Sequence, residues 1–262
     1  MRPATPRRER ILNYGGPGSS KTRSWLTIAE MYRKTKTPGT FYHLDTDDAY
    51  WANVEEFPEL PDSGKVVSNY AYDWEGYQAL ANEYKSKATP DDWIVGDLFD
   101  KGWEEVQNYY CQQTFGMDLA DYFLMKRKED EEKKKKGKNF QPLEGWVDWS
   151  VIKPMHAQFA NNLIFRHPAH VYLATTQKPV SRGTDKNDII DTFGHLGSKP
   201  GGEKSIGVHG VNTVLKFSQK KPGTWTMDTA KDRGARGIMV GVENKNFALD
   251  YLLNPDRGGW LL

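Results

Sequence analysis

The sequence has almost no cysteine, no excess of charge of either sign and no long apolar run. Its single cysteine, Cys111, excludes an internal disulfide, and no group of cysteine and histidine residues has zinc-site spacing. The apolar runs fall far short of the roughly 20 residues that a membrane-spanning helix needs. Residues 1–8 are basic but lack the apolar stretch of a secretory signal. We therefore expect a cytoplasmic protein with no membrane partner.

Charge is balanced over the 262 residues, with 36 lysine and arginine residues against 35 aspartate and glutamate residues. A net charge of +1 excludes a globally basic protein, so any contact with nucleic acid must come from local patches. Hydrophobic residues make up 37% of the chain and aromatic residues 13%, which is enough for a packed core. This length and composition lead us to expect a single domain over residues 1–262.

Short apolar segments alternate with amphipathic ones along most of the chain, which is typical of a parallel sheet with helices on its faces. Strands are expected at residues 10–14, 41–45, 66–70, 93–97 and 170–176. Helices are expected at residues 21–34, 73–88, 98–115 and 148–167. Further strands, expected to continue the sheet in antiparallel fashion, lie at residues 208–218, 225–230, 237–242 and 247–253. The fold class is therefore α/β.

Two polar segments interrupt this pattern. Residues 126–138 hold eight basic and four acidic residues and nothing apolar. Such a composition is typical of a solvated helix extension or a mobile loop, and a DNA-contacting arm is the alternative. Residues 178–205 contain several glycines and little that is apolar. We expect a charged mobile insertion at residues 126–140 and a mobile loop at residues 178–205.

A glycine-rich segment joins the first expected strand to the first expected helix. It consists of Gly15, Gly16, Pro17, Gly18, Ser19, Ser20, Lys21 and Thr22. The segment follows the P-loop pattern G-x-x-x-x-G-K-[ST], in which backbone N–H groups converge on phosphate oxygens at the start of a helix. We expect all eight residues to bind ATP, with Lys21 at the β- and γ-phosphates and the Thr22 hydroxyl on Mg²⁺. An ordinary strand–helix turn is the alternative, and Ser20 departs from the pattern because it replaces the last glycine.

Acidic residues follow two of the expected strands. Asp97 ends an apolar strand about 75 residues after the P-loop, where such sites carry the carboxylate that holds the Mg²⁺ shell through water. Asp100, one turn further, is the weaker candidate. Hydrolysis also needs a carboxylate to orient or deprotonate the attacking water, and Asp47 is favoured for that role. A helix N-cap is the alternative use of the acids after this strand.

The order of these features resembles the RecA-like recombinase core. In that family the second strand ends in an acid-x-Glu pair whose Glu activates water, and the matching residues here are Asp45 and Asp47. Aspartate for glutamate shortens the reach by one methylene. The resemblance implies that Gln177 senses the γ-phosphate and leads into a DNA-binding loop at residues 178–205.

The same resemblance assigns roles near the end of the chain. It implies that Lys231 and Arg233 reach across a subunit interface to the neighbour's γ-phosphate, which makes hydrolysis depend on assembly. The resemblance covers roughly residues 10–235 as an ordered set of short motifs. It is closest in character to phage-encoded RecA-like ATPases of single-strand annealing and recombination. It implies a homo-oligomer, as a ring or filament, that uses ATP and Mg²⁺ and whose ATPase is stimulated by single-stranded DNA in the host cytoplasm.

Three other functions remain open at this point. A phage packaging motor, helicase or loader would keep the ATPase, although no nuclease domain is recognisable after the core as in a packaging terminase. A small-molecule or nucleoside kinase would need residues 126–138 as its lid, and this stretch is poor in arginine. A nucleotide-gated binding protein would combine the altered P-loop and Asp47 with negligible turnover.

Overall fold

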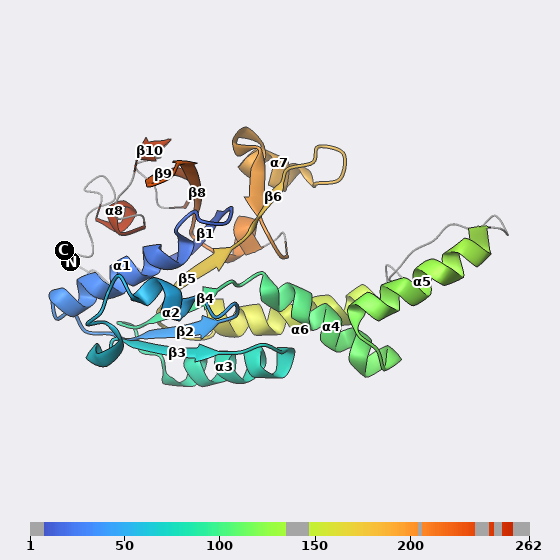
Figure 1. Cartoon of the computed structure of the whole chain (residues 1–262), viewed down its shortest axis with the longest axis horizontal. Helices are drawn as coiled ribbons and strands as arrows, with labels where there is room; N and C mark the ends of the chain where they lie inside the picture. The colour runs from blue at the N-terminus through green and yellow to red at the C-terminus, as the bar shows by residue number, and fades with distance from the viewer. Residues whose placement is uncertain (1–7, 135–146, 204–205, 234–240, 244–247, 254–262) are drawn as a thin grey trace, which may run out of the picture.

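The computed structural model describes residues 8–134, 147–203, 206–233, 241–243 and 248–253, and within these an eight-stranded sheet forms the centre of the molecule (Figure 1). The strands lie in the order β3-β2-β4-β5-β1-β8-β9-β10. Their bounds are β1 Arg10–Gly15, β2 Phe41–Asp45, β3 Val66–Tyr70, β4 Trp93–Asp97, β5 His170–Thr175, β8 Thr213–Lys221, β9 Thr224–Asp232 and β10 Val242–Glu243. All neighbours from β3 to β8 are parallel, and β9 and β10 continue the sheet in antiparallel fashion.

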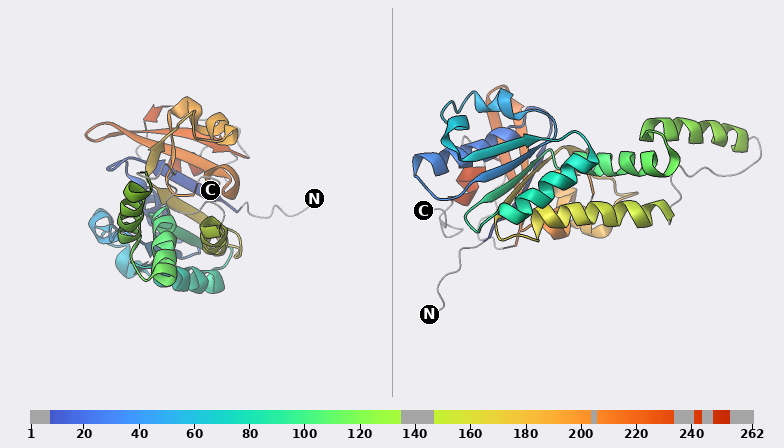
Figure 2. Two further views of the ribbon diagram at one scale, coloured as in Figure 1. Left: turned by 90° about the vertical axis from the view of Figure 1, so that its right-hand side faces the viewer. Right: turned by 90° about the horizontal axis from the view of Figure 1, so that it is seen from below.

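Helices cover both faces of this sheet (Figure 2). The helices of the first part of the chain are α1 Lys21–Lys34, α2 Tyr50–Val54, α3 Trp74–Lys87 and α4 Lys101–Phe115. Those of the second part are α5 Leu119–Lys134, α6 Val147–Ile164, α7 Asn187–Phe193 and α8 Ala248–Leu252. Side chains of α3, α4, α6 and α7 share one hydrophobic cluster, and side chains of α1, α2 and α8 share the other.

The strand sequences explain this two-sided burial. In β4, Trp93 and Val95 belong to the cluster under α1, whereas Ile94 between them belongs to the cluster under α3 and α6. Successive side chains of a strand point to opposite faces, so a strand covered on both sides must be apolar throughout. The expected fold class is thereby confirmed: α/β, with a mostly parallel sheet, flanking helices and antiparallel C-terminal strands.

The register of the parallel strands brings their carboxyl ends to one edge of the sheet. Asp45 at the end of β2 lies opposite Asp97 at the end of β4. The end of β1 at Gly15 enters the glycine-rich turn, and Thr175 ends β5 beside it. Residues far apart in the sequence thus meet at this edge, which we call the carboxyl edge.

The charged segment expected to be a mobile insertion is helical where the structure describes it. Residues 126–134 form the second half of α5, which extends away from the body of the molecule (Figure 1). Lys126 and Glu129, one turn apart, form an ion pair at 3.2 Å. Residues 135–140 lie outside the described residues. The helix extension considered from the composition is therefore the form adopted by residues 126–134.

The segment expected as a loop at residues 178–205 contains regular structure. Strands β6 Gln177–Pro179 and β7 Ser198–Pro200 pair with each other, and α7 and a 3-10 turn at Gly194–Leu196 lie between them. We call residues 177–203 the β6–β7 segment. A buried ion pair between Lys199 and Asp185 holds it from inside, and the Ser181 N–H donates to the same carboxylate at 2.8 Å. Two of the few apolar residues of the segment, Ile189 and Phe193 of α7, are buried in the hydrophobic cluster shared with α3, α4 and α6, and anchor the segment to the body of the molecule together with this ion pair.

Two strands expected near the end of the chain take a different form. Residues 247–253 were expected to be a strand, but Ala248–Leu252 form helix α8, which packs on α1. Leu249 and Leu252 are one helical turn apart and both are buried, so the apolar spacing fits a helix as well as a strand. The strand expected at residues 237–242 lies mostly outside the described residues. Residues 206–210 form a π-helical turn, and β8 begins at Thr213 and runs parallel to β1.

Candidate functional site at the carboxyl edge

The glycine-rich segment forms a tight turn between β1 and α1. Gly18 has φ of +68°, and the Ser19 N–H donates to the Gly16 carbonyl at 3.3 Å. A Cβ at Gly15 would lie 2.4 Å from the carbonyl oxygen of Phe217 on β8, so only glycine fits there without moving the strand. One side of the turn is thus packed closely against β8. The other side, with the start of α1, borders a cavity.

Ser20 adopts the backbone conformation that favours glycine. It has φ of 68° and ψ of 31° at the N-cap of α1, with no side-chain capping hydrogen bond. A left-handed conformation costs a residue with a Cβ roughly 1 kcal/mol or more. Serine in place of the last glycine of the P-loop pattern therefore raises the conformational energy of the turn and adds a hydroxymethyl group at the start of α1. The backbone at this position still has the left-handed conformation that glycine favours.

Replacing Ser20 by glycine is expected to tighten binding of ATP to the turn several-fold, because it removes the Cβ and the hydroxymethyl group at the start of α1. The free energy of unfolding should change by less than about 1 kcal/mol, since relief of the left-handed conformation offsets the greater freedom of glycine in the unfolded chain. Titration calorimetry and urea unfolding measure the two effects. Ser19→Gly is the matched control and should not tighten binding; unchanged affinity in Ser20→Gly would contradict the interpretation.

Lys21 lies over the turn with its ammonium group on backbone carbonyls. Its Nζ donates to the Gly15 and Gly16 carbonyls, each at 3.1 Å. Burial lowers the pKa of Lys21, and the carboxylates of Asp97, Asp100 and Asp47 act in the opposite direction. Several acidic groups thus surround a cation that can exchange its carbonyl contacts for phosphate oxygens.

Asp97 is buried at the end of β4 with one oxygen that lacks a partner. Its Oδ2 accepts a hydrogen bond from Trp25 Nε1 at 3.3 Å, whereas Oδ1 makes no hydrogen bond with any described residue. Burial raises the pKa of Asp97 to about 7, and the Thr22 hydroxyl beside it works in the opposite direction. A buried carboxylate oxygen without a donor, next to a hydroxyl, fits the oxygen ligands that Mg²⁺ prefers.

The two acids after β2 have different surroundings. Both oxygens of Asp45 accept backbone hydrogen bonds, from Asp47 N at 3.3 Å and from Tyr50 N at 3.2 Å, so this buried residue fixes the start of α2. Asp47 borders the cavity described next. Burial raises the pKa of Asp47, and the neighbouring charge of Asp45 adds to the rise. Both acids therefore contribute to the start of α2, because the Asp47 carboxylate also accepts a backbone hydrogen bond from Ala49, the N-cap residue, while it borders the cavity.

A cavity of about 390 Å³ lies over the turn. This volume suits a small-molecule ligand. The lining comprises P-loop residues together with residues after β2, β4 and β5: Gly15, Pro17, Gly18, Ser19, Ser20, Lys21, Thr22, Asp47, Asn53, Leu98 and Thr176. We call this space the P-loop cavity. It brings together most of the side chains expected to bind nucleotide and Mg²⁺, and Asp97 lies buried beneath it.

Gln177 lies against the P-loop, at the start of the β6–β7 segment. Its side-chain Nε2 is 3.3 Å from the position that a Cβ on Gly16 would occupy. The side chain is exposed, so it is available to a ligand at the turn. Its role as a γ-phosphate sensor stays a prediction.

Asp100 connects the P-loop cavity to the β6–β7 segment. Its carboxylate accepts hydrogen bonds from the Thr176 hydroxyl and from the Thr176 N–H, the latter at 3.2 Å. Gly201 N–H donates to the Thr176 carbonyl at 2.8 Å, and a Cβ at Gly202 would lie 2.9 Å from the Asp100 Cβ. The carboxylate that we considered as a weaker metal ligand is thus engaged with Thr176, a pairing that no sequence spacing indicates.

Lys231 and Arg233 lie far from the P-loop of their own chain. Met227 on β9 faces Phe217, which faces Gly15, and Lys231 comes four residues later. Four residues of strand span about 13 Å along the strand, away from the carboxyl edge and toward the end of the sheet at which the parallel strands begin. The structure therefore does not bring Lys231 and Arg233 together with their own phosphate site.

These two cations have a third beside them. Arg233 N–H donates to the Asn212 carbonyl at 2.9 Å, and the Arg10 guanidinium donates to the Asn212 side chain at 2.9 Å. Burial, with the charges of Arg233 and Arg10, lowers the pKa of Lys231 to about 8. The Lys231 ammonium donates to the Val211 carbonyl at 2.9 Å, so it is engaged within its own chain, in a cluster of cations at the edge opposite the P-loop.

Two further residues touch the P-loop and were not expected from the sequence. Trp225 Nε1 donates to the Gly18 carbonyl at 2.9 Å, and Gln219 Oε1 lies 3.3 Å from the position of a Cβ on Gly18. Arg23 stacks over the Trp225 ring at 5.9 Å. The β8–β9 hairpin therefore buttresses the turn, through contacts that span about 200 residues of sequence.

Comparison with known proteins finds similar solved structures but no similar family model or curated protein. No protein-family model matches the chain, and no curated protein matches it. Among solved structures, the chain is similar to a KaiC-like protein from Pyrococcus horikoshii OT3, with 12% identity and a TM-score of 0.49 over 90% of this chain and 85% of the other. Within the described parts of the chain, no helix is long and apolar enough to span a membrane, and no three histidine, cysteine or acidic residues form a metal cluster.

Proposed function

We propose that the chain is an oligomeric P-loop ATPase, completed between subunits and acting on single-stranded DNA. The observation that carries the proposal is the separation of two half-sites. Lys21, Thr22, Asp97 and Asp47 gather at the carboxyl edge, whereas the cations Lys231 and Arg233 lie at the opposite edge. Neither half neutralises a transferring phosphoryl group without the other, and two copies related head to tail bring them together.

The residues of the P-loop cavity have distinct roles in this proposal. The turn and Lys21 bind the phosphates of ATP. The Thr22 hydroxyl and, through water, Asp97 would hold Mg²⁺, which would supply positive charge at the phosphate oxygens. Asp47 accepts a proton from the water that attacks the γ-phosphorus, as the bond to the ADP oxygen breaks and inorganic phosphate leaves. The raised pKa of Asp47 suits it to accept that proton.

The β6–β7 segment supports the assignment of single-stranded DNA. Lys178, Arg182 and Lys186 are exposed on it, and such cations bind a phosphate backbone in a salt-dependent way. Lys199 is not available because it is buried in its ion pair with Asp185. Gln177 connects the segment directly to the P-loop. The proposed role is recombination or annealing, and a kinase is disfavoured because no described residue of α5 lines the P-loop cavity.

The ATPase rate, measured with and without single-stranded DNA over a range of protein concentrations, tests the proposal. We expect stimulation by DNA and a specific activity that rises steeply with concentration, since the site forms only on assembly. A specific activity independent of concentration and of DNA would contradict it. Transfer of the γ-phosphate to a small acceptor instead of water would establish the kinase alternative.

A further inference from the structure

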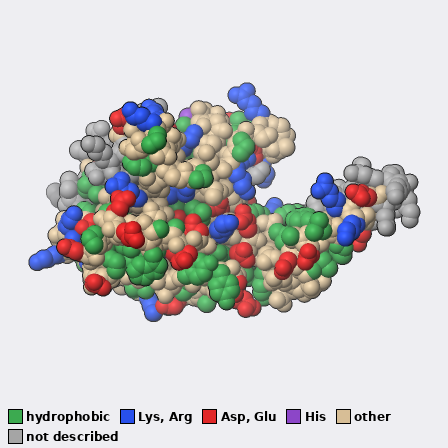
Figure 3. Space-filling model, in the orientation of Figure 1, with side chains coloured by type: hydrophobic (Ala, Val, Ile, Leu, Met, Phe, Trp, Pro, Cys, Tyr) green, Lys and Arg blue, Asp and Glu red, His purple; other side chains and the backbone are tan. Residues whose placement is uncertain are grey.

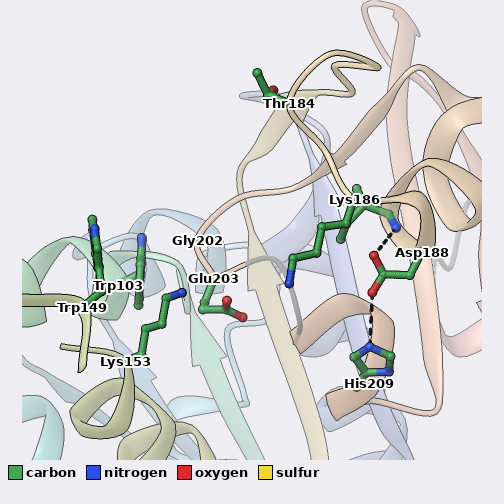
Figure 4. A pocket seen from close by; sticks show the side chains of 10 residues that line it. Trp103, Trp149, Lys153, Thr184, Lys186, Asp188, Gly202, Glu203 and His209 are labelled. Atoms are coloured by element: carbon green, nitrogen blue, oxygen red, sulfur yellow. Dashed lines mark hydrogen bonds and ion pairs between the residues drawn. The ribbon is translucent and has the colours of Figure 1, made fainter. Parts of the chain in front are cut away.

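A second cavity, of about 490 Å³, lies between the β6–β7 segment and helices α4 and α6 (Figure 4). The space-filling view shows the surface hollowed between these parts (Figure 3). Trp103 and Trp149 line one wall, and Lys186 and Asp188 of the β6–β7 segment line the other. Gly202 of the same segment lies against Trp103, whose Cβ is 3.7 Å from the position of a Cβ on Gly202. We call this space the tryptophan cavity. None of its lining residues belongs to the P-loop cavity.

The aromatic wall is a pair of stacked indoles. The rings of Trp103 and Trp149 are 5.9 Å apart at their centroids and inclined by only 10°. His156 packs edge-on against Trp103 at 5.0 Å, which fixes the pair from behind. Both tryptophans are only partly buried, although they are large and apolar. Partly exposed, parallel aromatic rings form a platform on which a nucleobase can stack.

Cations stand on opposite walls of the tryptophan cavity. Lys153 comes from α6 next to the indoles, and Lys186 comes from the β6–β7 segment, with both side chains exposed (Figure 4). An ion pair between His209 and Asp188, at 3.4 Å, closes the wall beside Lys186. Glu203 also lines the cavity, between the two lysines (Figure 4), so the two acids and two lysines balance in charge. The ammonium groups on both sides of a flat apolar surface are the contacts that phosphates flanking a stacked base would use. A base within a strand has a phosphate on each side, whereas a free mononucleotide has only one, so the two lysines favour the strand.

The tryptophan cavity shares a wall with the P-loop cavity. Gly202 lines the tryptophan cavity and packs on Asp100. Asp100 accepts the hydrogen bonds of Thr176, and Thr176 lines the P-loop cavity. Three residues in direct contact therefore separate the two spaces. A ligand that shifts Gly202 must act on Thr176 through one buried carboxylate, and coupling between two binding sites is reciprocal.

We propose that the tryptophan cavity takes one base of single-stranded DNA, stacked on the Trp103 and Trp149 pair, with the flanking phosphates at Lys153 and Lys186. Gly202, Asp100 and Thr176 transmit its occupancy to the P-loop cavity. The inference rests on the proposed function, because single-stranded DNA is the ligand in both. It adds the place where a base is held and the route by which DNA stimulates hydrolysis.

Fluorescence anisotropy of a labelled oligothymidylate, titrated with the full chain, tests the site. Trp149→Leu keeps an apolar side chain but removes the ring, and we expect its Kd to rise about tenfold or more. Lys153→Gln, an exposed change that spares the fold, should weaken binding several-fold and lower the salt slope by about one. The controls are Tyr72→Leu, which removes an exposed ring elsewhere, and Lys85→Gln. Both should bind like the wild type.

The outcomes of this experiment distinguish a failure of the cavity assignment from a failure of the proposed function. If the wild type binds the oligonucleotide and both Trp149→Leu and Lys153→Gln bind it as tightly as the wild type, the cavity assignment is wrong and the proposed function stands. If the wild type hydrolyses ATP but binds no oligonucleotide, the proposed function itself falls. If thymidine monophosphate competes as well as the oligonucleotide at equal nucleotide concentration, the cavity serves a free nucleotide and the strand assignment is overturned.

The transmission route has its own readout. Asp100→Asn keeps the size of the side chain but weakens the charge-assisted hydrogen bonds from Thr176. We expect the variant to bind oligothymidylate and ATP separately like the wild type, with the stimulation of hydrolysis by DNA largely lost. Stimulation of the wild-type size in Asp100→Asn would overturn the route.

Discussion

Replacing Arg233 by alanine is expected to lower ATP turnover about a thousandfold while ATP affinity stays within about twofold of the wild type. The register of β8 and β9 keeps Arg233 away from its own P-loop, so its loss cannot disturb binding there directly. A cation supplied by the neighbouring subunit acts mainly on the charge that develops during phosphoryl transfer. Single-turnover hydrolysis and binding of a fluorescent ATP analogue measure the two effects. Lys220→Ala, an exposed lysine change on the same hairpin, is the control.

Mixing two inactive variants makes this prediction sharper. Lys21→Ala lacks the phosphate contact but keeps Arg233, and Arg233→Ala has the reverse defect. Each alone should be inactive, and random assembly of equal amounts should recover about a quarter of the interfaces, those that pair an intact P-loop with an intact Arg233. No recovery on mixing, together with a loss of ATP binding in Arg233→Ala as severe as in Lys21→Ala, would show that Arg233 acts within its own chain.

The conformation of the P-loop turn could be predicted because it depends on residues that are neighbours in the sequence. The residues of the P-loop are contiguous, and their conformation follows from glycine, a strand before them and a helix after them. The positions of Asp97 and Asp47 could be predicted for a related reason. Parallel strands end at one edge, so acids after different strands meet there. Sequence order and strand polarity are enough for such a prediction, whereas the left-handed conformation of Ser20 is evident only in the structure.

The remaining site contacts join residues whose separation carries no periodic signal. Trp225 on Gly18 and Thr176 on Asp100 depend on how a distant hairpin and a strand end settle on the edge of the sheet. The β6–β7 segment was expected to be a loop because apolar content was low, yet two buried apolar residues, Ile189 and Phe193, and the buried ion pair of Lys199 with Asp185 give it regular structure. Helix α8 shows the converse limit, since a short apolar run fits a buried helix and a strand equally well.

The acid at the end of β4 gives the second large effect. Asp97→Asn removes the charge but keeps an oxygen that can accept the Trp25 hydrogen bond. We expect Mg²⁺-dependent ATP turnover to fall about a hundredfold, the upper end of the effect of losing an outer-shell partner of a metal. Binding of ATP in the presence of EDTA should stay close to the wild type, because the P-loop backbone and Lys21 are unchanged.

Thermal unfolding separates this metal role from a structural one. The pKa of Asp97 is raised to about 7, so below that pH the carboxyl group is mostly protonated and Mg²⁺ must displace the proton. The extra stabilisation by Mg²⁺ over ATP alone should therefore grow as pH rises from 6 to about 7 and level off above it. In Asp97→Asn the Mg²⁺ increment should be small at every pH, while Asp62→Asn, an exposed control, behaves like the wild type. A full Mg²⁺ increment in Asp97→Asn would move the metal to another carboxylate, such as Asp47, which lines the P-loop cavity.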